Sequence, residues 1–338
     1  MKFQLVKLKF YSPFQISKGS VDYTDIDEML HSVTIKNALF VCAKQLFGNE
    51  INETFFDDFL ISSAFPYFKD DFFFPKPFLK LPLKIKDADK TEAKKLKKLQ
   101  WIEKSLFENV IAGKETEICK NDFSKDGKFL SKQFSKLDDK EKRIVYKIEE
   151  TQRVRIKYDD DAEPFYSSRI HFAKESGLYV LIKIKTENQE FYDKILKPAF
   201  GLLGSNGIGS YKNLGNGQFE PEFVSESFTI SFPQNATHQM CLSLFCPTKK
   251  EIENFSITKS SYQLVKRGGY LASPEDISKM SWRKKSIYMF QEGSVFPNDQ
   301  KLTGKLVDVT PEGLTHKVWR EGRAIFIPVI NNHQKSEQ

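Results

Sequence analysis

A glycine-rich segment carries the residue types that suit binding of a polyanion. Residues 201–217 contain six glycines, and Ser210, Tyr211 and Lys212 stand between the pairs Gly-Ile-Gly and Gly-Asn-Gly. Glycine reaches positive φ at low cost and allows a backbone to approach closely. A hydroxyl and an ammonium group suit phosphate, and an aromatic ring can stack on a base. The segment therefore predicts a loop that holds a ligand.

Two nucleotide-binding motifs do not fit this loop. A P-loop requires Gly-x-x-x-x-Gly-Lys-Ser/Thr, which the segment does not contain. A dinucleotide fingerprint lies between a strand and a helix, whereas this loop is expected to follow a helix and precede a strand. A helix C-cap is the remaining alternative, for which Gly201 or Gly204 alone would suffice.

Composition limits the broad class of the protein. The chain has 338 residues, 40% of them hydrophobic, and a formal net charge of +7, which favours polyanionic partners only mildly. No apolar run reaches the roughly 18 residues that span a bilayer, and the N-terminus does not resemble a signal peptide, so we expect no membrane association and a mature chain that begins at Met1. Four cysteines without Cys-x-x-Cys spacing predict no structural zinc and a reducing, cytoplasmic location.

Hydrophobic patterns predict the elements of the first part of the chain. Alternation over 1–10 indicates a strand, and Ser32 is a candidate N-cap for a helix that stops at Gly48. The Phe- and Pro-rich residues 62–83 are expected to be extended chain and not a central strand. A Lys-rich helix is expected within 84–112, and a mobile polar loop over 113–142.

The pattern returns to strands after this insertion. We expect a strand over 143–158, a hairpin over 168–185 that turns at residues 175–177, a second helix that opens with a capping box at Thr186, and a strand over 217–223. With the insertion set aside, this order approximates a βαββαβ ferredoxin-like unit. Mostly short strands follow.

These elements predict an α+β protein of two ferredoxin-like (RRM-like) domains. The first covers 1–223, with a Lys-rich helical insertion at about 62–142 and the glycine-rich loop at 201–217. The second, over 224–338, is expected to be a degenerate, strand-rich copy.

Two charged runs and one histidine are further candidates. Arg153, Arg155 and Lys157 alternate along the predicted strand, so their side chains share one face and could follow a nucleic-acid backbone, or form a solvated edge. Asp159, Asp160 and Asp161 could bind a divalent metal, although an exposed acidic turn fits better, so no metal site is expected. His31 is the one plausible general base, but a lone histidine is more often structural.

Several short motifs, in this order, resemble the RAMP superfamily of CRISPR effector subunits. The resemblance covers nearly the whole chain, and is strongest to the type III-A (Csm) subunit that caps the 5′ end of the guide RNA. The similar segments are Ser12-Pro13-Phe14-Gln15-Ile16-Ser17-Lys18-Gly19, His31-Ser32-Val33-Thr34-Ile35, Phe74-Pro75-Lys76-Pro77-Phe78, the glycine-rich loop ending Gly215-Asn216-Gly217-Gln218-Phe219, Lys284-Lys285-Ser286-Ile287-Tyr288 with Gly293-Ser294-Val295-Phe296, and His316-Lys317-Val318-Trp319-Arg320.

The resemblance implies a role, partners and RNA-binding residues. The role is a subunit that holds the 5′ repeat-derived tag of the crRNA and docks the large polymerase/cyclase-like subunit, beside a RAMP backbone subunit, and meets target RNA only indirectly. A helix N-terminus and a glycine loop both offer N–H groups to phosphate. The residues expected to contact RNA are Ser17, Lys18, Gly19, His31, Ser32, Thr34, Arg153, Arg155, Lys157, Gly207, Gly209, Ser210, Tyr211 and Lys212.

Two alternatives to this role remain open. The first is a metal-independent RAMP endoribonuclease that processes crRNA precursors with His31 as base. Such nucleases generally carry the glycine loop near the C-terminus, whereas here roughly 120 residues follow it. The second is the equivalent subunit of the type III-B complex. We expect no catalytic residues and no cofactor.

Overall fold

The computed structural model describes residues 1–18, 23–86, 93–137, 144–156, 162–184, 189–254, 256–271 and 282–331. Its centre is a nine-stranded sheet whose main path runs β12-β1-β11-β3-β4-β6-β8. The first four of these are β12 (Phe219–Phe223), β1 (Lys2–Phe10), β11 (Ser176–Ile184) and β3 (Phe65–Phe68), and each pairs antiparallel with its neighbour. The chain is therefore a mixed protein of strands and helices, as predicted.

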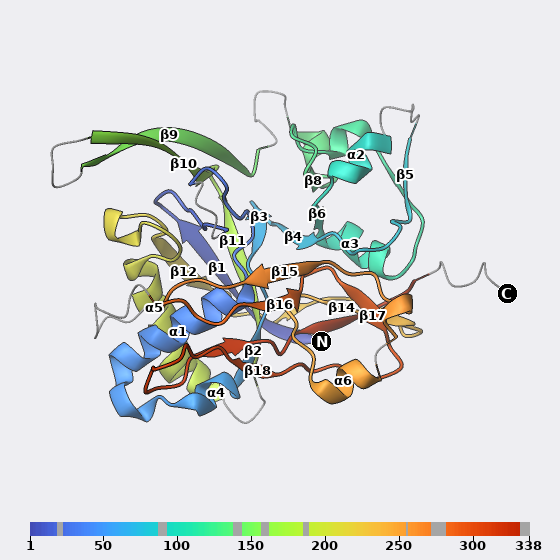
Figure 1. The fold of residues 1–338 in the computed structure, drawn as a ribbon. Helices are drawn as coiled ribbons and strands as arrows, with labels where there is room; N and C mark the ends of the chain where they lie inside the picture. Colours follow the sequence, from blue (N-terminus) through green and yellow to red (C-terminus); the bar gives the residue numbers. More distant parts are fainter. Residues whose placement is uncertain are drawn as a thin grey trace.

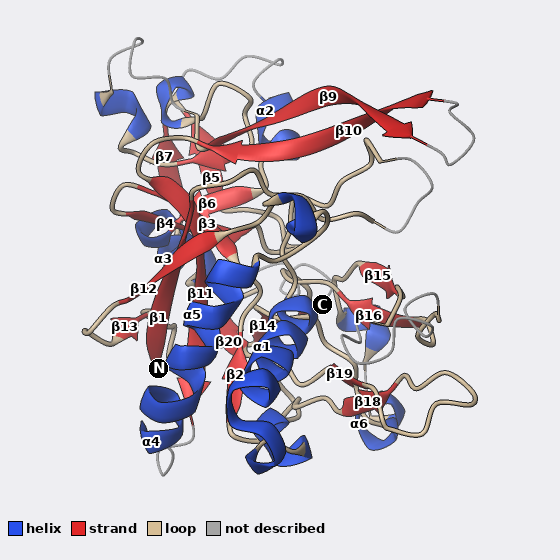
Figure 2. Ribbon diagram, turned by 90° about the vertical axis from the view of Figure 1, so that its left-hand side faces the viewer, coloured by secondary structure: helices blue, strands red, loops and turns tan. Residues whose placement is uncertain are grey.

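Two helices pack side by side on this sheet (Figures 1 and 2). Helix α1 (Ser32–Phe47) begins after His31 as N-cap and ends at Gly48, whose φ of 56° favours glycine. The second helical segment is continuous through α4 (Gln189–Phe191), a π-helical turn (Tyr192–Leu196) and α5 (Lys197–Asn206). Both predicted helices are present, and Thr186, the expected cap of the second, lies outside the described residues.

The Phe- and Pro-rich residues 62–83 extend the sheet, so the expectation that they form no central strand was wrong. β3 lies between β11 and β4 (Asp71–Pro75). Pro66 is tolerated because β4 pairs only with Tyr67 and Phe68, so the missing N–H of Pro66 interrupts no bond of that ladder. Phe65 and Phe74 are fully buried, which explains the density of aromatic residues.

The insertion is also more ordered than expected. The single helix predicted over 84–112 is two short helices, α2 (Ala93–Lys98) and α3 (Lys104–Ile111), separated by β6 (Trp101–Glu103). Within 113–142, the described residues form β7 (Thr116–Ile118), β8 (Phe129–Leu130) and two 3₁₀ turns (Lys120–Asp122 and Phe134–Lys136). The aromatic side chains Phe123, Phe129 and Phe134 are buried there. These three rings fix a segment that its polar composition marked as mobile.

The expected hairpin over 168–185 pairs differently. β10 (Ala162–Phe172) pairs along its whole length with β9 (Tyr146–Ile156), while β11 enters the central sheet. Both strands were located, but the partner of β10 was wrong, because the chain after residue 172 turns into the core instead of folding back. The β9–β10 hairpin projects from the body of the molecule (Figures 1 and 2).

The remaining elements are short. Before the glycine loop they are 3₁₀ turns at Gly48–Glu50 and Glu53–Phe56, β2 (Phe59–Ile61) and β5 (Leu83–Ile85). After it they are a 3₁₀ turn (Lys212–Leu214), β13 (Phe228–Thr229), β14 (His238–Cys241), α6 (Lys249–Glu253), a 3₁₀ turn (Ile257–Lys259), β15 (Leu264–Arg267), β16 (Ile287–Phe290), β17 (Val295–Pro297), β18 (Leu306–Asp308), β19 (Trp319–Glu321) and β20 (Phe326–Val329). The described C-terminal part is thus rich in strands. No helix in the described ranges is long and apolar enough to cross a membrane.

The C-terminal part packs into the same hydrophobic core as the N-terminal part. Met240, Ile327 and Val329 belong to the same buried cluster as Leu5 on β1. A buried ion pair joins α1 to β19, since Lys36 Nζ lies 2.6 Å from Glu321 Oε2 and the two side chains are 0% and 3% exposed. The start of α1 is therefore fixed by residues from both ends of the chain.

Candidate nucleic-acid interface

The glycine-rich loop packs against the segment that leaves β1. The N–H of Ser210 donates to the carbonyl of Gln15 at 2.8 Å, and the N–H of Gly217 donates to that of Pro13 at 2.7 Å. A Cβ at Gly209, where φ is 96°, would overlap the Gln15 carbonyl oxygen. Gly207, with φ of 75°, is the C-cap of α5. These glycines therefore allow close packing of protein backbone, and the loop leaves Lys212 exposed and Tyr211 half-buried.

Tyr211 occupies a fixed position on this loop. Its backbone is left-handed, with φ of 56° and ψ of 29°. Its ring centre lies 6.5 Å from that of Tyr23, and the guanidinium carbon of Arg153 lies 5.3 Å from the Tyr211 ring centre. The loop, the segment after β1 and the base of the β9–β10 hairpin therefore meet at this tyrosine.

Arg155 adds a second cation at the same place. Its Nη2 donates to the Tyr23 hydroxyl at 2.8 Å, and its guanidinium carbon is 5.8 Å from the ring centres of both Tyr23 and Phe165. Strand pairing sets Phe165 opposite Arg153. We call Tyr23, Arg153, Arg155, Phe165 and Tyr211 the aromatic–arginine cluster. A guanidinium group is attracted to the face of an aromatic ring, and both guanidinium groups and rings can stack on bases.

The neighbouring residues expected to contact RNA differ in position. Lys212 is exposed in the turn that follows Tyr211, and Ser210 is half-buried. Lys18 is exposed and pairs with Asp25 at 2.8 Å. Ser17 is half-buried and forms a β-bridge with Ile26.

Five other predicted residues lie outside the described parts of the chain. Gly19 and Lys157 are two of the expected RNA contacts. The other three are Asp159, Asp160 and Asp161, the acidic run that was considered as a site for a divalent metal.

His31 and Ser32 lie in the interior. His31 is 2% exposed, with Nδ1 2.9 Å from Glu292 Oε1 and Nε2 3.0 Å from Asp27 Oδ2. Ser32 is 1% exposed, and its Oγ accepts from the N–H of Leu244 at 3.1 Å. Both side chains therefore hold the start of α1 against the C-terminal part. Neither is presented to solvent.

The charge state of His31 follows from its two acidic neighbours. Burial lowers the pKa of His31, but Glu292 and Asp27 outweigh it and raise the pKa to about 9. Burial raises the pKa of Asp27, and the hydrogen bond and charge of His31 bring it below its usual value. His31 is thus an imidazolium at neutral pH, with both ring nitrogens engaged, and has no basic nitrogen to accept a proton from RNA.

Thr34 lies at the edge of the same region. Its Oγ1 is 3.3 Å from Arg267 Nη2, and Arg267 Nη1 is 3.5 Å from Asp27 Oδ2. Tyr23, Phe165 and Arg267 were not among the individual residues expected to contact RNA. The register of β9 with β10 brings Phe165 to the arginines, and that register was not predicted.

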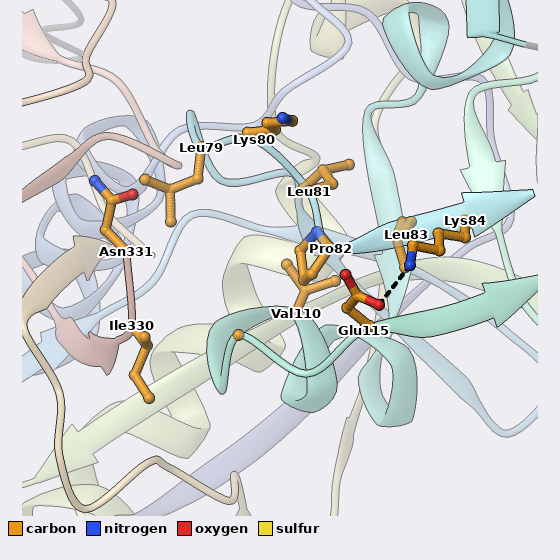
Figure 3. A pocket seen from close by; sticks show the side chains of 11 residues that line it. Leu79, Lys80, Leu81, Pro82, Leu83, Lys84, Val110, Glu115, Ile330 and Asn331 are labelled. Carbon is orange, nitrogen blue, oxygen red and sulfur yellow. Dashed lines mark hydrogen bonds and ion pairs between the residues drawn. The ribbon is translucent and has the colours of Figure 1, made fainter. Parts of the chain in front are cut away.

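A cavity of about 360 Å³ lies elsewhere, between the insertion and the end of β20 (Figure 3). Leu79, Leu81, Val110 and Ile330 are among its lining residues, and the Lys84–Glu115 ion pair at 2.6 Å stands at its edge. Its lining mixes aliphatic side chains with polar ones such as Lys80 and Asn331, and it contains none of the residues predicted to bind RNA.

Known proteins of similar length match nearly the whole chain, and one family model matches its C-terminal part. Residues 234–329 match the family model of the CRISPR Csm4 C-terminal domain. The "CRISPR system Cms protein Csm4" of Methanocaldococcus jannaschii is 25% identical and that of Thermococcus onnurineus 26% identical, over 97% and 95% of this chain and 97% and 94% of theirs.

Solved structures share the fold. A chain in the crystal structure of a Csm3-Csm4 subcomplex in the type III-A CRISPR-Cas interference complex superposes with a TM-score of 0.63 at 21% identity, over 97% of this chain and 99% of that one. A chain in a Csm1-Csm4 cassette in complex with cA4 gives a TM-score of 0.59 at 21% identity, over 98% and 99%.

Proposed function

Because the chain belongs to the Csm4 family, we propose that it is a non-catalytic, RNA-binding subunit of a type III-A CRISPR interference complex. In this role it holds the 5′ repeat-derived tag of the crRNA. The observation that carries the proposal is the aromatic–arginine cluster, where Arg153 and Arg155 flank the rings of Tyr211 and Tyr23. Rings and guanidinium groups that converge on one surface suit single-stranded RNA, whose bases are free to stack.

The proposed RNA surface extends from this cluster along the glycine-rich loop. Lys212 and Lys18 supply exposed cations for phosphates, Ser17 and Ser210 supply hydroxyls, and Gly19 and Lys157 remain part of the proposal. The buried His31 and Ser32 support this surface from inside by fixing α1. Thr34 would contribute to this surface indirectly, because its hydroxyl accepts a hydrogen bond from the Arg267 guanidinium at 3.3 Å.

The fold and the partners of the chain are part of the same proposal. The antiparallel order β12-β1-β11-β3, with α1 and α5 as connections, supports a ferredoxin-like first unit over 1–223. A second, degenerate unit would follow from 224. The large subunit Csm1 and the backbone subunit Csm3 are the proposed protein partners, because relatives of the same fold are found with each. Target RNA would be met indirectly, and a cytoplasmic location stays a prediction.

The nuclease alternative conflicts with the position of His31. A general base requires a neutral nitrogen within reach of the substrate, and His31 is buried, with its two nitrogens on Asp27 and Glu292. The type III-B equivalent would use the same RNA surface and stays open.

Binding of labelled RNA tests the proposal. The purified chain is mixed with RNA that carries or lacks the repeat-derived 5′ tag, with and without chelator and across salt concentrations. We expect salt-dependent binding that requires the tag and leaves the RNA intact. Cleavage within the repeat that is lost in His31→Ala would instead support the nuclease.

A further inference from the structure

Gln15 is a buried glutamine at the point where the three segments of the aromatic–arginine cluster meet. It is 1% exposed and lies in the segment that leaves β1. Its backbone carbonyl accepts from the N–H of Ser210 in the glycine-rich loop at 2.8 Å. Its side chain reaches the other two segments, since Nε2 donates to the carbonyl of Tyr23 at 3.2 Å and Oε1 accepts from Oγ of Ser167 on β10 at 3.2 Å. Gln15 therefore bonds to the loop, to Tyr23 and to the hairpin at once.

The partners of this side chain fix the orientation of its amide group. The carbonyl oxygen of Tyr23 can only accept, so the group that faces it must be the NH2 of Gln15. The amide oxygen is then left for the hydroxyl of Ser167, which is fully buried. The side chain at position 15 therefore has to supply one donor and one acceptor in a fixed arrangement. Leucine has a similar size but supplies neither group.

Two donors hold the backbone of Tyr23. Besides Nε2 of Gln15, the N–H of Ser168 on β10 donates to the same carbonyl at 3.3 Å. Backbone bonds between residues 16–18 and 25–27 hold the chain beyond it. The carbonyl of Tyr23 is thus fixed by one bond from β10 and one from the Gln15 side chain, and loss of the second would leave this residue held by a single long bond.

The position of Tyr23 sets the geometry of the groups around its ring. The ring centre is 5.3 Å from that of Phe165, and the hydroxyl accepts from Nη2 of Arg155 at 2.8 Å. Ser167 lies two residues from Phe165 on β10, so both side chains are on the same face of the hairpin. The bond between Ser167 and Gln15 therefore holds the face that carries Phe165 towards Tyr23.

We propose that Gln15 is a positioning residue for RNA binding, which sets the spacing of the Tyr23 and Tyr211 rings on which bases stack. The inference rests on the proposed function. The carbonyl of Gln15 is bonded to the loop that carries Tyr211, and its amide is bonded to Tyr23, so one residue connects the two rings. Gln15 is buried and neutral, so it touches no phosphate. Loss of its side chain should therefore weaken stacking and leave the number of phosphate contacts unchanged.

The test compares two variants of this contact with a matched control. Gln15→Leu removes both side-chain bonds and keeps the backbone bond to the loop, whereas Ser167→Ala removes only one bond. Ser243→Ala is the control, because the Ser243 hydroxyl is also fully buried, donates to the carbonyl of Ile61 at 2.8 Å and accepts from the N–H of Ile325 at 3.2 Å. Binding of tagged RNA by the full chain is measured across salt concentrations, and denaturant unfolding is measured on the same variants.

Gln15→Leu is expected to weaken binding of tagged RNA about tenfold, within the range for loss of one stacked base. The slope of log K against log salt should keep its wild-type value, because no phosphate contact is removed. Ser167→Ala should show a smaller loss of affinity at the same slope, and keeps the test decisive if Gln15→Leu does not fold. Ser243→Ala should lower the free energy of unfolding and leave the affinity of the folded chain unchanged.

A double-mutant cycle tests whether Gln15 acts through the ring of Tyr23. Tyr23→Ala removes the ring and keeps the backbone carbonyl to which the amide donates. If Gln15 positions the ring, Gln15→Leu should cost little further affinity in the Tyr23→Ala background, so the two losses do not add. Losses that add fully would overturn the positioning role.

The outcomes separate this inference from the function it deepens. If the wild-type chain binds no tagged RNA, both fail. If the wild type binds while Gln15→Leu and Ser167→Ala lose no more affinity than Ser243→Ala, the positioning role is wrong and the proposed function stands. A reduced salt slope in Gln15→Leu would also contradict the inference, because phosphate contacts would then have been lost.

Discussion

The guanidinium of Arg153 lies over the ring of Tyr211, 5.3 Å from its centre. This contact joins the base of a projecting hairpin to a glycine-rich loop that follows a helix. It also defines a surface of fixed shape, because Tyr211 is held in a left-handed backbone conformation and the loop is bonded to Pro13 and Gln15. A base that stacks here would meet rings and cations already in place.

Removing the ring or a cation of this cluster is expected to weaken RNA binding. Tyr211→Ala should cost about 1–3 kcal/mol, the range for a base stacked on an aromatic ring, and Arg155→Gln should also reduce the dependence on salt. Fluorescence anisotropy with tagged RNA measures both. Lys183→Gln removes an equal charge from an exposed position on β11 and is the control. Equal losses in Arg155→Gln and the control would show that only net charge matters.

Two glycines near the end of α5 should respond oppositely to alanine. Gly209→Ala would place a Cβ against the Gln15 carbonyl at a φ of 96°, so we expect a loss of about 2 kcal/mol or more in the free energy of unfolding. Gly201 is helical with nothing within 4 Å of a Cβ, so Gly201→Ala should stabilise the chain by about 0.5–1 kcal/mol. Denaturant unfolding measures both changes. Equal tolerance at the two positions would contradict the packing of the loop.

The buried ion pair between α1 and β19 should be sensitive to loss of one partner. Glu321→Gln leaves Lys36 buried without its carboxylate, and we expect a loss of about 3–5 kcal/mol in the free energy of unfolding. Glu115→Gln breaks the Lys84–Glu115 pair, whose side chains are 66% and 71% exposed, and should change stability by about 1 kcal/mol or less. Similar values for the two variants would mean that the α1–β19 contact does not hold the two parts together.

The His31 contacts predict a specific dependence of stability on pH. The pKa of His31 is raised in the folded chain to about 9, so the folded state binds a proton more tightly than the unfolded state. This contribution to stability is fully present below about pH 6.5 and is lost as the pH rises to about 9. Unfolding of the wild type and of His31→Gln, compared from pH 6 to 9.5, should show a difference that shrinks over this window. A constant difference would mean that His31 is not charged in the fold.

Periodic patterns predicted the elements that form locally. The alternation of β1 and the stop of α1 at Gly48 are confirmed, because each depends on neighbouring residues. The pairing of β10 with β9, and the place of β3 inside the sheet, depend on contacts between distant segments, and both were wrong in the sequence analysis. Proline at position 66 was taken as excluding a central strand. The ladder between β3 and β4 includes only Tyr67 and Phe68 of β3, so it does not require an N–H from Pro66.

The candidate site was predictable in part for the same reason. Tyr211, Arg153 and Arg155 were found from residue type and spacing, and they come together in the structure. Tyr23 and Phe165 carry no local signal and join the cluster only through tertiary packing. The burial of His31 depends on Glu292, a partner 261 positions away that no local pattern indicates.

Cross-linking of tagged crRNA to the full chain tests the central claim most directly. Photoreactive bases are placed at each position of the tag, and the linked peptides are identified by mass spectrometry. The account expects tag bases to link to peptides that contain Tyr211 or Tyr23, with Tyr211→Ala reducing the yield and the RNA staying intact. Links confined to the guide portion of the RNA, or to peptides outside the aromatic–arginine cluster, would contradict it.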